Sequence, residues 1–244
     1  AVQDTFQETR TIPEPAGALA LAGLKKYTKS KGLKSKNLIA INSGANLNFD
    51  RLGHIVERVQ LGENKEVLLS VRIPEEKGSF RSFCKVLGKR MISEFNYRAE
   101  DSSEATIFVA CRFNDSNQRT KLLKHLRSNG YSPKDLSENE VAKLHVKHMV
   151  GGRAPETVSN KGEFLFRVEF PERPGALVDF LDRLSDKWNI TLFHYRNQGS
   201  AYGRVLVGFE SQPKNYLQLN KYLEKTGFRF WDETDNLAYK SFLK

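Results

Sequence analysis

The sequence EVLLSVRIPEEKGSFRSF at residues 66–83 returns in altered form 97 positions later, as EFLFRVEFPERPGALVDF at residues 163–180. The correspondence continues further along both copies. ISEFNYR at 92–98 matches ITLFHYR at 190–196, and LLKHLRSNGY at 122–131 matches LNKYLEKTGF at 219–228. Two segments that agree at their start, middle and end, with one single-residue shift, form a tandem repeat.

Each copy carries the same order of structural signals. Alternating apolar residues predict a strand at Val67–Ile73 and another at Phe164–Phe170, and each strand runs into a Pro-Glu-x-x-Gly turn. A helix, a strand ending in Phe-x-Tyr-Arg, a β-rich strand, a helix ended by Gly130 or Gly227 and a short strand follow. The order βαββαβ predicts an α+β fold, with a four-stranded antiparallel sheet and two helices on one face. We expect the two units to pair through their sheet edges or through their helix faces.

The first 62 residues lie outside the repeat and show a different pattern. We expect a helix over LALAGLKKYTKSKG, ended by Gly32, a buried strand at Asn37–Asn42, and a helix from Asp50 to about Gln60. The turn SGAN at 43–46 follows the strand, at the position where open α/β sheets bind ligands. It is either an ordinary turn or part of a ligand site. A small enzyme with Ser43 as nucleophile is disfavoured, because no base is positioned in a recognisable motif.

Composition restricts the class of protein. Lys and Arg number 39 against 29 Asp and Glu, and this net charge of +10 is spread along the chain. A βαββαβ module that binds RNA is therefore an alternative, although no RNP1-like string is present. We expect neither a signal peptide nor a membrane-spanning segment. Cys84 and Cys111 lie in apolar segments without ligand spacing, so we expect buried free thiols and no metal site.

Several strings occur in an order that resembles the biosynthetic threonine deaminases. They are EPAGALALAG at 14–23, SGAN at 43–46, EEKGSF at 75–80, FNYR at 95–98, PERPGAL at 171–177 and WNITLFHYR at 188–196. The resemblance covers nearly the whole chain. It implies two tandem ferredoxin-like (ACT-like) regulatory subdomains, preceded by the tail of a fold-type II pyridoxal-phosphate α/β domain.

The resemblance also implies boundaries and a function. The catalytic tail would occupy residues 1–62, the regulatory subdomains 63–150 and 163–244, and a linker 151–162. In that family pyridoxal phosphate drives the conversion of L-threonine to 2-oxobutanoate and ammonia, the first step toward isoleucine. Isoleucine inhibits the enzyme, and valine counteracts the inhibition.

Two residues match positions of the family's cofactor pocket. Ser43 resembles the serine whose hydroxyl meets the pyridine nitrogen of pyridoxal phosphate, and Glu14 resembles a glutamate that lines the same pocket. The family's Schiff-base lysine and glycine-rich phosphate loop lie upstream of this region, so we expect no catalytic residue here and no activity of the chain alone. The family also implies a homotetramer, and a cytoplasmic, plastid or mitochondrial location.

The regulatory chemistry follows from what an amino-acid effector presents. Gly78 and Gly175 end the Pro-Glu-x-x-Gly turns, where backbone amides at a helix start favour a carboxylate. Tyr97 and Tyr195 resemble paired tyrosines implicated in effector binding in plant relatives, and Arg196 adjoins the second. We expect Phe95 and Phe193 to be core residues, and His194 to point to the opposite sheet face.

Overall fold

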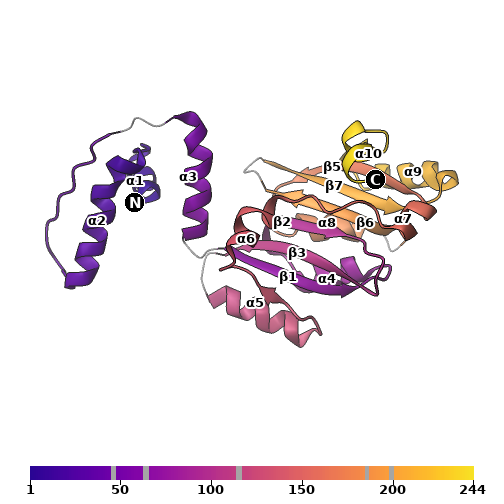
Figure 1. Ribbon diagram of the computed structural model, residues 1–244, viewed down its shortest axis with the longest axis horizontal. Coiled ribbons are helices and arrows are strands. Elements are labelled where there is room, and N and C mark those ends of the chain that lie inside the picture. The colour runs from indigo at the N-terminus through magenta and orange to yellow at the C-terminus, as the bar shows by residue number, and fades with distance from the viewer. Residues whose placement is uncertain (45–47, 63–65, 114–116, 185–186, 198–200) are drawn as a thin grey trace. The chain divides into compact units, whose positions relative to one another are not determined.

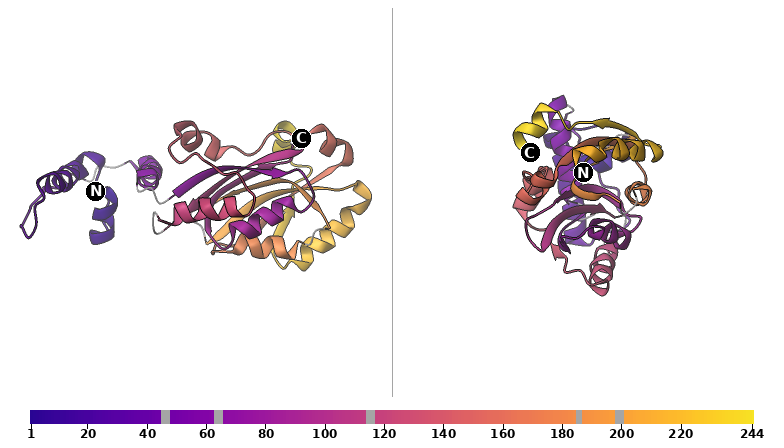
Figure 2. Two further views of the ribbon diagram at one scale, coloured as in Figure 1. Left: turned by 90° about the horizontal axis from the view of Figure 1, so that it is seen from below. Right: turned by 90° about the vertical axis from the view of Figure 1, so that its right-hand side faces the viewer.

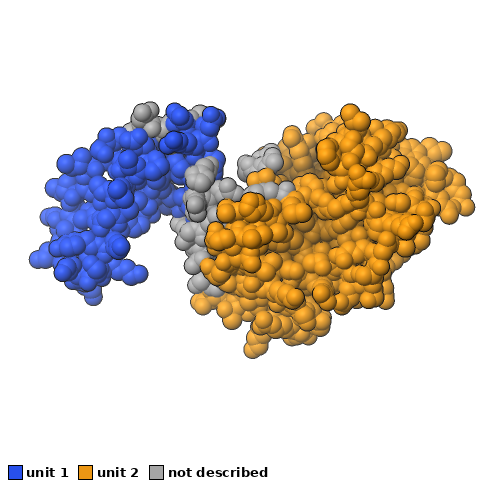
Figure 3. Space-filling model, viewed as in Figure 1, with its two compact units in different colours: residues 1–63 blue, residues 64–244 orange. Residues whose placement is uncertain are grey.

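The computed structural model describes residues 1–44, 48–62, 66–113, 117–184, 187–197 and 201–244. The chain divides into two compact units, residues 1–63 and residues 64–244 (Figure 3). In the described part of the first unit the helices are α1 (Val2–Thr9), α2 (Pro15–Lys31) and α3 (Phe49–Gly62). None of the helices in the described ranges is long and apolar enough to cross a membrane.

Helix α2 is bounded as its sequence predicts. Pro15 takes the first helical position, where its fixed φ fits and its missing N–H is not needed. Gly32 ends the helix in the left-handed conformation, at φ 60°, and its N–H donates to the carbonyls of Lys29 and Thr28. The glycine can adopt this positive φ without steric penalty.

The predicted strand at Asn37–Asn42 is wrong. These residues have no regular secondary structure, and the side chains of Ile39 and Ile41 are 91% and 78% exposed. A strand forms only beside another strand that accepts and donates its backbone hydrogen bonds. The described part of this unit contains no such neighbour. The apolar pattern at Asn37–Asn42 therefore does not mark a buried strand in the described part of this unit.

Both repeats adopt the predicted βαββαβ order, which confirms the tandem ferredoxin-like fold (Figure 1). The first repeat consists of β1 (Glu66–Pro74), α4 (Ser79–Leu87), β2 (Met91–Arg98), β3 (Glu104–Arg112), α5 (Asn117–Ser128) and β4 (Lys134–Asp135). The second consists of β5 (Glu163–Pro171), α8 (Ala176–Arg183), β6 (Asn189–Arg196), β7 (Tyr202–Glu210), the 3-10 turn η2 (Pro213–Asn215), α9 (Tyr216–Lys225) and β8 (Arg229–Asp232).

The repeats join through their sheet edges, which settles the alternative that the sequence left open. The strand order is β4-β1-β3-β2-β6-β7-β5-β8, with antiparallel pairing of β2 and β6 at the centre. In that pairing Phe95 lies opposite Tyr195, and Tyr97 lies opposite Phe193. Helices α4 and α8 also pack against each other below this seam. The two repeats therefore share one continuous sheet and one core.

The long helices α4, α5, α8 and α9 cover one face of the sheet (Figure 2). The residues of α4 that repeat at helical spacing, Phe80, Phe83 and Leu87, are buried against it. Phe95 and Phe193 are fully buried, and their rings lie 5.8 Å apart, as predicted for core residues. Burying apolar area contributes roughly 25 cal/mol per Å², so this aromatic seam is a principal source of stability.

The opposite face, here called the back face, carries short elements that the sequence did not predict. They are α6 (Glu140–Leu144), the 3-10 turn η1 (Val146–His148), α7 (Glu156–Lys161) and α10 (Leu237–Phe242). Ala142 packs on Leu68 and Phe108 of the first repeat, and Tyr239 packs on Leu165 and Leu192 of the second. The expected linker at 151–162 therefore contains a helix. Cys84 and Cys111 are free and buried, as predicted.

A buried ion pair ties the repeats together on the back face. Arg98 of β2 donates to both carboxylate oxygens of Glu163 in β5, at 2.6 and 3.1 Å. Their side chains are 7% and 3% exposed. Arg98 also donates to the Leu243 carbonyl at 2.8 Å, and the Tyr239 hydroxyl donates to Glu163 at 2.7 Å. Breaking this pair would leave a charge buried without its partner, which is strongly unfavourable.

We expect Arg98→Met to lower the free energy of unfolding by about 3–5 kcal/mol, because Glu163 would remain buried and charged. Urea unfolding followed by fluorescence measures this; Trp188 and Trp231 both lie in the second repeat. The control is Arg72→Met, which breaks an exposed pair with Glu104 at 3.5 Å, with side chains 65% and 53% exposed. That change should cost less than about 1 kcal/mol. Equal losses of unfolding free energy in the two variants would show that the burial of the Arg98–Glu163 pair does not determine its contribution to stability.

His194 lies on the back face, as its alternation with Tyr195 predicts. Burial, helped by the nearby Arg196 charge, lowers the pKa of His194 to about 4. An unfolded histidine titrates near 6.5, so between these two values the unfolded chain binds a proton that the folded chain excludes. Stability that is fully present above pH 6.5 is therefore lost as the pH falls toward 4.

We expect His194→Gln to remove this component of the pH dependence. Relative to the variant, the parent chain should lose roughly 3 kcal/mol of unfolding free energy between pH 7 and pH 4, because the pKa of His194 is about 4 in the folded chain and near 6.5 in the unfolded chain. Urea titrations at several pH values measure the difference in unfolding free energy between the parent chain and the variant. The carboxylates titrate in both chains, so their contribution cancels in this difference. The control His125→Gln changes an exposed histidine and should alter the difference much less. Parallel curves for the parent chain and His194→Gln would contradict the prediction.

Candidate functional site

The side chain of Tyr195 meets the second Pro-Glu-x-x-Gly turn. Its hydroxyl donates to the carboxylate of Glu172, and its ring stacks on Phe170 at 5.9 Å between centroids. Gly203 of β7 lies directly against both groups. A Cβ atom at Gly203 would come within 2.9 Å of Tyr195 Cε2 and 2.8 Å of Glu172 Oε2. The tyrosine, the glutamate and the turn thus form one close-packed cluster.

The first repeat builds the matching cluster around Tyr97. Its hydroxyl donates to Glu75 Oε1 at 3.0 Å, and the backbone N–H of Glu100 donates to the other carboxylate oxygen at 3.3 Å. The ring of Tyr97 lies 4.9 Å from that of Phe80. Burial raises the pKa of Glu75, although the bond from Tyr97 acts in the opposite direction. Burial also raises the pKa of both tyrosines, which keeps them as neutral donors.

Both clusters lie at the start of a helix. Gly78 precedes α4 at φ 93°, and Gly175 precedes α8 at φ 86°, a conformation that favours glycine. Neither helix start has a side-chain hydrogen bond as a cap. The first amides of a helix have no partner within the helix and carry partial positive charge. A carboxylate of a ligand can therefore bind at either start.

A small cavity adjoins Tyr195 at the boundary between the repeats. Its volume is about 20 Å³, and Gly175, Glu172 and Tyr195 face Gly88, Met91 and Ile92 of the first repeat across it. The Lys89 side chain lies on the turn, since a Cβ atom at Gly175 would come within 2.9 Å of Lys89 Cγ. A space of this size holds about one water molecule. An amino acid can enter only if the turn or Lys89 moves.

Sequence reasoning found the tyrosines and glycines of these clusters and missed three other members. Glu75 and Glu172 are the second residues of the Pro-Glu-x-x-Gly turns, and this shared position was the signal that could have revealed them. Gly203 could not be found from the repeat, because its counterpart opposite Ile73 is Ala105, a residue that also fits there.

Arg196 is not brought into the Tyr195 cluster. It alternates with Tyr195 along β6 and so lies on the back face, with its Nε 4.0 Å from the buried carboxylate of Glu94.

The placement of the sheet aromatics also bears on the RNA-binding alternative. RNA-recognition modules stack bases on exposed sheet aromatics, whereas Phe95, Tyr97, Phe193 and Tyr195 are all buried beneath the helix layer. That alternative has no support in the fold.

The two clusters differ in shape. Phe80 of the first repeat corresponds to Leu177 of the second, and the Phe80 ring fills the space between Tyr97 and Phe193, 4.9 and 5.0 Å away. Leu177 is smaller and lines the cavity beside Tyr195. The clusters are therefore related but not identical sites.

In the first unit the residues predicted for the cofactor pocket lie together. The Glu14 N–H donates to the Gly44 carbonyl at 3.1 Å, next to Ser43, whose side chain is exposed. A Cβ atom at Gly44 would come within 2.5 Å of Glu14 Oε1, so the glycine is needed for this approach. Ala45 and Asn46 of the SGAN turn lie outside the described residues. No group of three or more His, Cys, Asp or Glu in the described ranges could hold a metal ion.

Comparison with known proteins agrees with the division into two repeats. The family described as the C-terminal regulatory domain of threonine dehydratase matches residues 57–146 and 156–243, one match for each repeat. The biosynthetic L-threonine dehydratase of Escherichia coli (strain K12) is 47% identical over 247 residues, covering all of this chain and 47% of the relative.

Two eukaryotic relatives extend the comparison. The mitochondrial threonine dehydratase of Saccharomyces cerevisiae is 44% identical, covering all of this chain and 44% of the relative. The chloroplastic biosynthetic threonine dehydratase of Arabidopsis thaliana is 40% identical, covering 98% of this chain and 40% of the relative. This chain spans about half or less of the length of the relatives that it matches. Two tandem matches over most of the second unit establish that the chain belongs to the family of threonine dehydratase C-terminal regulatory domains.

Proposed function

We propose that this chain is the regulatory portion of a biosynthetic threonine dehydratase and that it senses free L-isoleucine and L-valine at the Tyr97 and Tyr195 clusters. One observation carries the proposal: a tyrosine–glutamate pair occurs twice at the seam between the repeats, each time beside a helix start without a side-chain cap. Isoleucine would act as the inhibitor, and valine would counteract it.

The clusters offer a partner for each part of an amino acid. The carboxylate of Glu172 can accept from the effector's ammonium group. The Ala176 N–H already donates to the Arg173 carbonyl, so the next amides of the first turn of α8, at Leu177 and Val178, can donate to the effector's carboxylate. Leu177 and the ring of Phe170 supply an apolar wall for the side chain. In the first repeat Glu75, Gly78 and Tyr97 take the same roles. We leave Arg196 out of direct contact with the effector, because it lies on the other sheet face.

Selectivity between isoleucine and valine needs more than one pocket. The two effectors differ by one methylene, which is worth only about 1–3 kcal/mol in an apolar site. The cavity beside Tyr195 has a volume of only about 20 Å³, too small for an amino acid, so binding must be coupled to an enlargement of the cavity. A change at the β2–β6 seam would pass to both repeats, and the difference between Phe80 and Leu177 lets the two effectors favour different states.

The whole enzyme would convert L-threonine to 2-oxobutanoate and ammonia with pyridoxal phosphate, which supplies an electron sink when bound. The described residues fit one side of that cofactor's pocket. Ser43 is exposed, and its hydroxyl would meet the ring nitrogen, while Glu14 would line the same edge beside Gly44. A hydroxyl, unlike a carboxylate, does not hold the ring nitrogen in its protonated form. We further propose that the full-length protein is a homotetramer, located in the cytoplasm, plastid or mitochondrion as in its relatives.

We expect Tyr195→Phe to raise the Kd for L-isoleucine about tenfold or more. The ring still packs on Phe170, but the donor that orients Glu172 is lost, and a hydrogen bond to a charged group is worth about 1.5–3 kcal/mol. Isothermal titration calorimetry measures the change. The control Tyr216→Phe removes another tyrosine–carboxylate bond in the same repeat, to Asp232 at 2.6 Å, and should leave the Kd unchanged. Unaltered affinity in Tyr195→Phe would remove this residue from the site.

We expect the 244-residue chain alone to have no threonine dehydratase activity, because the family's Schiff-base lysine has no counterpart in a comparable motif here. The assay supplies pyridoxal phosphate and L-threonine and measures 2-oxobutanoate. A full-length relative serves as the positive control. Production of 2-oxobutanoate above the rate with the cofactor alone would overturn the assignment of catalysis to the part of the enzyme not contained in this chain.

A further inference from the structure

The seam between β2 and β6 has two ends that the backbone builds alike. At the first end, where β2 finishes, the Ala99 N–H donates to the Thr191 carbonyl at 2.7 Å. At the second end, where β6 finishes, the Asn197 N–H donates to the Ser93 carbonyl at 2.8 Å. Because the two bonds are equivalent, the backbone ladder alone gives both ends of the seam the same resistance to separation.

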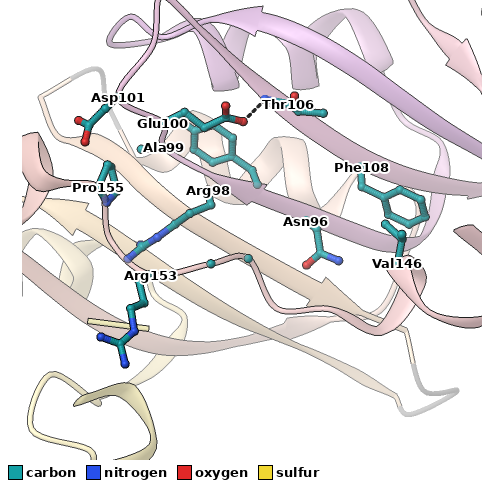
Figure 4. Close-up of a pocket in the computed structure, with 13 residues that line it drawn as sticks. Asn96, Arg98, Ala99, Glu100, Asp101, Thr106, Phe108, Val146, Arg153 and Pro155 are labelled. Carbon is teal, nitrogen blue, oxygen red and sulfur yellow. Dashed lines mark hydrogen bonds between the residues drawn. The ribbon is translucent and has the colours of Figure 1, made fainter. Parts of the chain in front are cut away.

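Side chains clamp the first end on the back face. Arg98 donates to both carboxylate oxygens of Glu163 at 2.6 and 3.1 Å, and the two side chains are 7% and 3% exposed. Glu163 begins β5, which lies on the far side of β6 and β7 in the sheet. Arg98 borders a back-face cavity of about 560 Å³, and Figure 4 shows its side chain extending away from β2 toward the segment that carries Arg153 and Pro155. Separation of this end would break a buried ion pair, which is strongly unfavourable.

The second repeat leaves a passage for this bridge. Arg98 lies opposite Leu192, and Leu192 lies opposite Gly208. A Cβ atom at Gly208 would come within 2.8 Å of Glu163 Oε1 and 3.1 Å of Leu192 Cβ. Because position 208 has no side chain, the carboxylate of Glu163 can lie over it and meet the arginine.

The second end of the seam lacks this passage. Arg196, the counterpart of Arg98, lies opposite Glu94, and Glu94 lies opposite Ala110. These two residues stand where the second repeat has a leucine and a glycine. The Arg196 Nε lies 4.0 Å from the Glu94 carboxylate, and the arginine side chain is 44% exposed. A long ion pair with a half-exposed partner contributes much less to holding two strands together than a buried, bidentate one.

Glu66, the counterpart of Glu163, is held within its own repeat. Its carboxylate lies 2.6 Å from Lys147 Nζ, with the two side chains 5% and 8% exposed, and it also accepts from the Ser93 hydroxyl. All of its partners in the described ranges belong to the first repeat. Glu66 therefore stabilises the back face of the first repeat, whereas Glu163 ties the second repeat to the first.

The helix layer shows the same inequality. At the first end the Phe80 ring fills the space between Tyr97 and Phe193, 4.9 and 5.0 Å away. At the second end a cavity of about 20 Å³ remains beside Tyr195, lined by the smaller side chain of Leu177. The second end is thus less tightly filled as well as less tightly tied.

We propose that the β2–β6 seam is a hinge that opens at one end. The Arg98–Glu163 pair keeps the first end closed, and separation of β2 and β6 at the second end enlarges the cavity beside Tyr195. Arg98 and Glu163 act as positioning residues, because they decide which end moves without touching that cavity. The hinge is a property of the chain without any ligand, so the proposal does not rest on the proposed function.

The test measures amide hydrogen exchange in the whole isotope-labelled chain by NMR. The reporters are the equivalent amides of Asn197 and Ala99, and the amide of Val109 in the centre of β3 reports opening of the whole unit. After correction for intrinsic rates, we expect the protection of Asn197 to be about tenfold or more below that of Ala99. The two hydrogen bonds have nearly the same length, so bond length does not account for such a difference.

Variants identify the clamp. Arg98→Met/Glu163→Met removes both charges, so neither is left buried without its partner. Relative to Val109, this variant should lose about tenfold or more of the protection at Ala99, while Asn197 changes little. The matched control Arg196→Met removes the equivalent arginine of the second repeat and should leave the protection of both reporters unchanged.

Equal protection of Asn197 and Ala99 in the parent chain would overturn the proposal, and this comparison is decisive even when the double variant does not fold. The proposal is also wrong if Ala99 keeps its protection in the folded double variant, or loses as much in Arg196→Met. A parent chain that binds no L-isoleucine would contradict the proposed function and leave the exchange pattern as expected. Failure of the hinge is therefore distinguishable from failure of the effector sites.

Discussion

The structure depends on the pairing of β2 with β6. This contact turns two four-stranded units into one eight-stranded sheet and sets Phe95 opposite Tyr195 and Tyr97 opposite Phe193. A shift of one strand by one residue would send the two rings of that strand to the other face and separate them from the rings of its partner. The register therefore fixes three things at once: the aromatic core, the Arg98–Glu163 pair on the back face, and the position of each tyrosine at the turn of its own repeat.

The duplicated clusters show how a stable fold can carry a responsive site. Each tyrosine is held by core packing on its ring and by a glutamate at its hydroxyl, so the aromatic part is fixed and the polar part can exchange partners. The second cluster contains almost no empty space, and its wall is shared with the first repeat. Effector binding there must displace something, and the displaced wall belongs to the neighbouring repeat. Such an arrangement converts occupancy into a change of geometry between subdomains.

Local signals made most of the second unit predictable. The strands, the Pro-Glu-x-x-Gly turns and the glycines at helix ends each depend on a few neighbouring residues, and the repeat allowed each copy to support the other. What failed depended on partners distant in sequence. The Asn37–Asn42 segment has a strand's composition but no neighbouring strand, and the Tyr195–Glu172 bond joins residues that only the finished sheet brings together. Asn96 has a buried side-chain amide without a hydrogen-bond partner among the described residues, and nothing in the sequence marks it, because its burial depends on how distant segments pack.

Joining through sheet edges has a consequence for how such chains can be divided. The strands that pair at the seam, β2 and β6, occupy equivalent positions in the two repeats and run antiparallel, so they are related by an approximate two-fold axis. A chain with only one repeat would expose this strand as a long unpaired edge. A second copy of the same repeat, turned about that axis, would complete it. The tandem chain thus has the symmetry of a two-fold dimer within one polypeptide. The sequences of its two repeats can diverge independently, whereas two identical subunits must keep the same sequence.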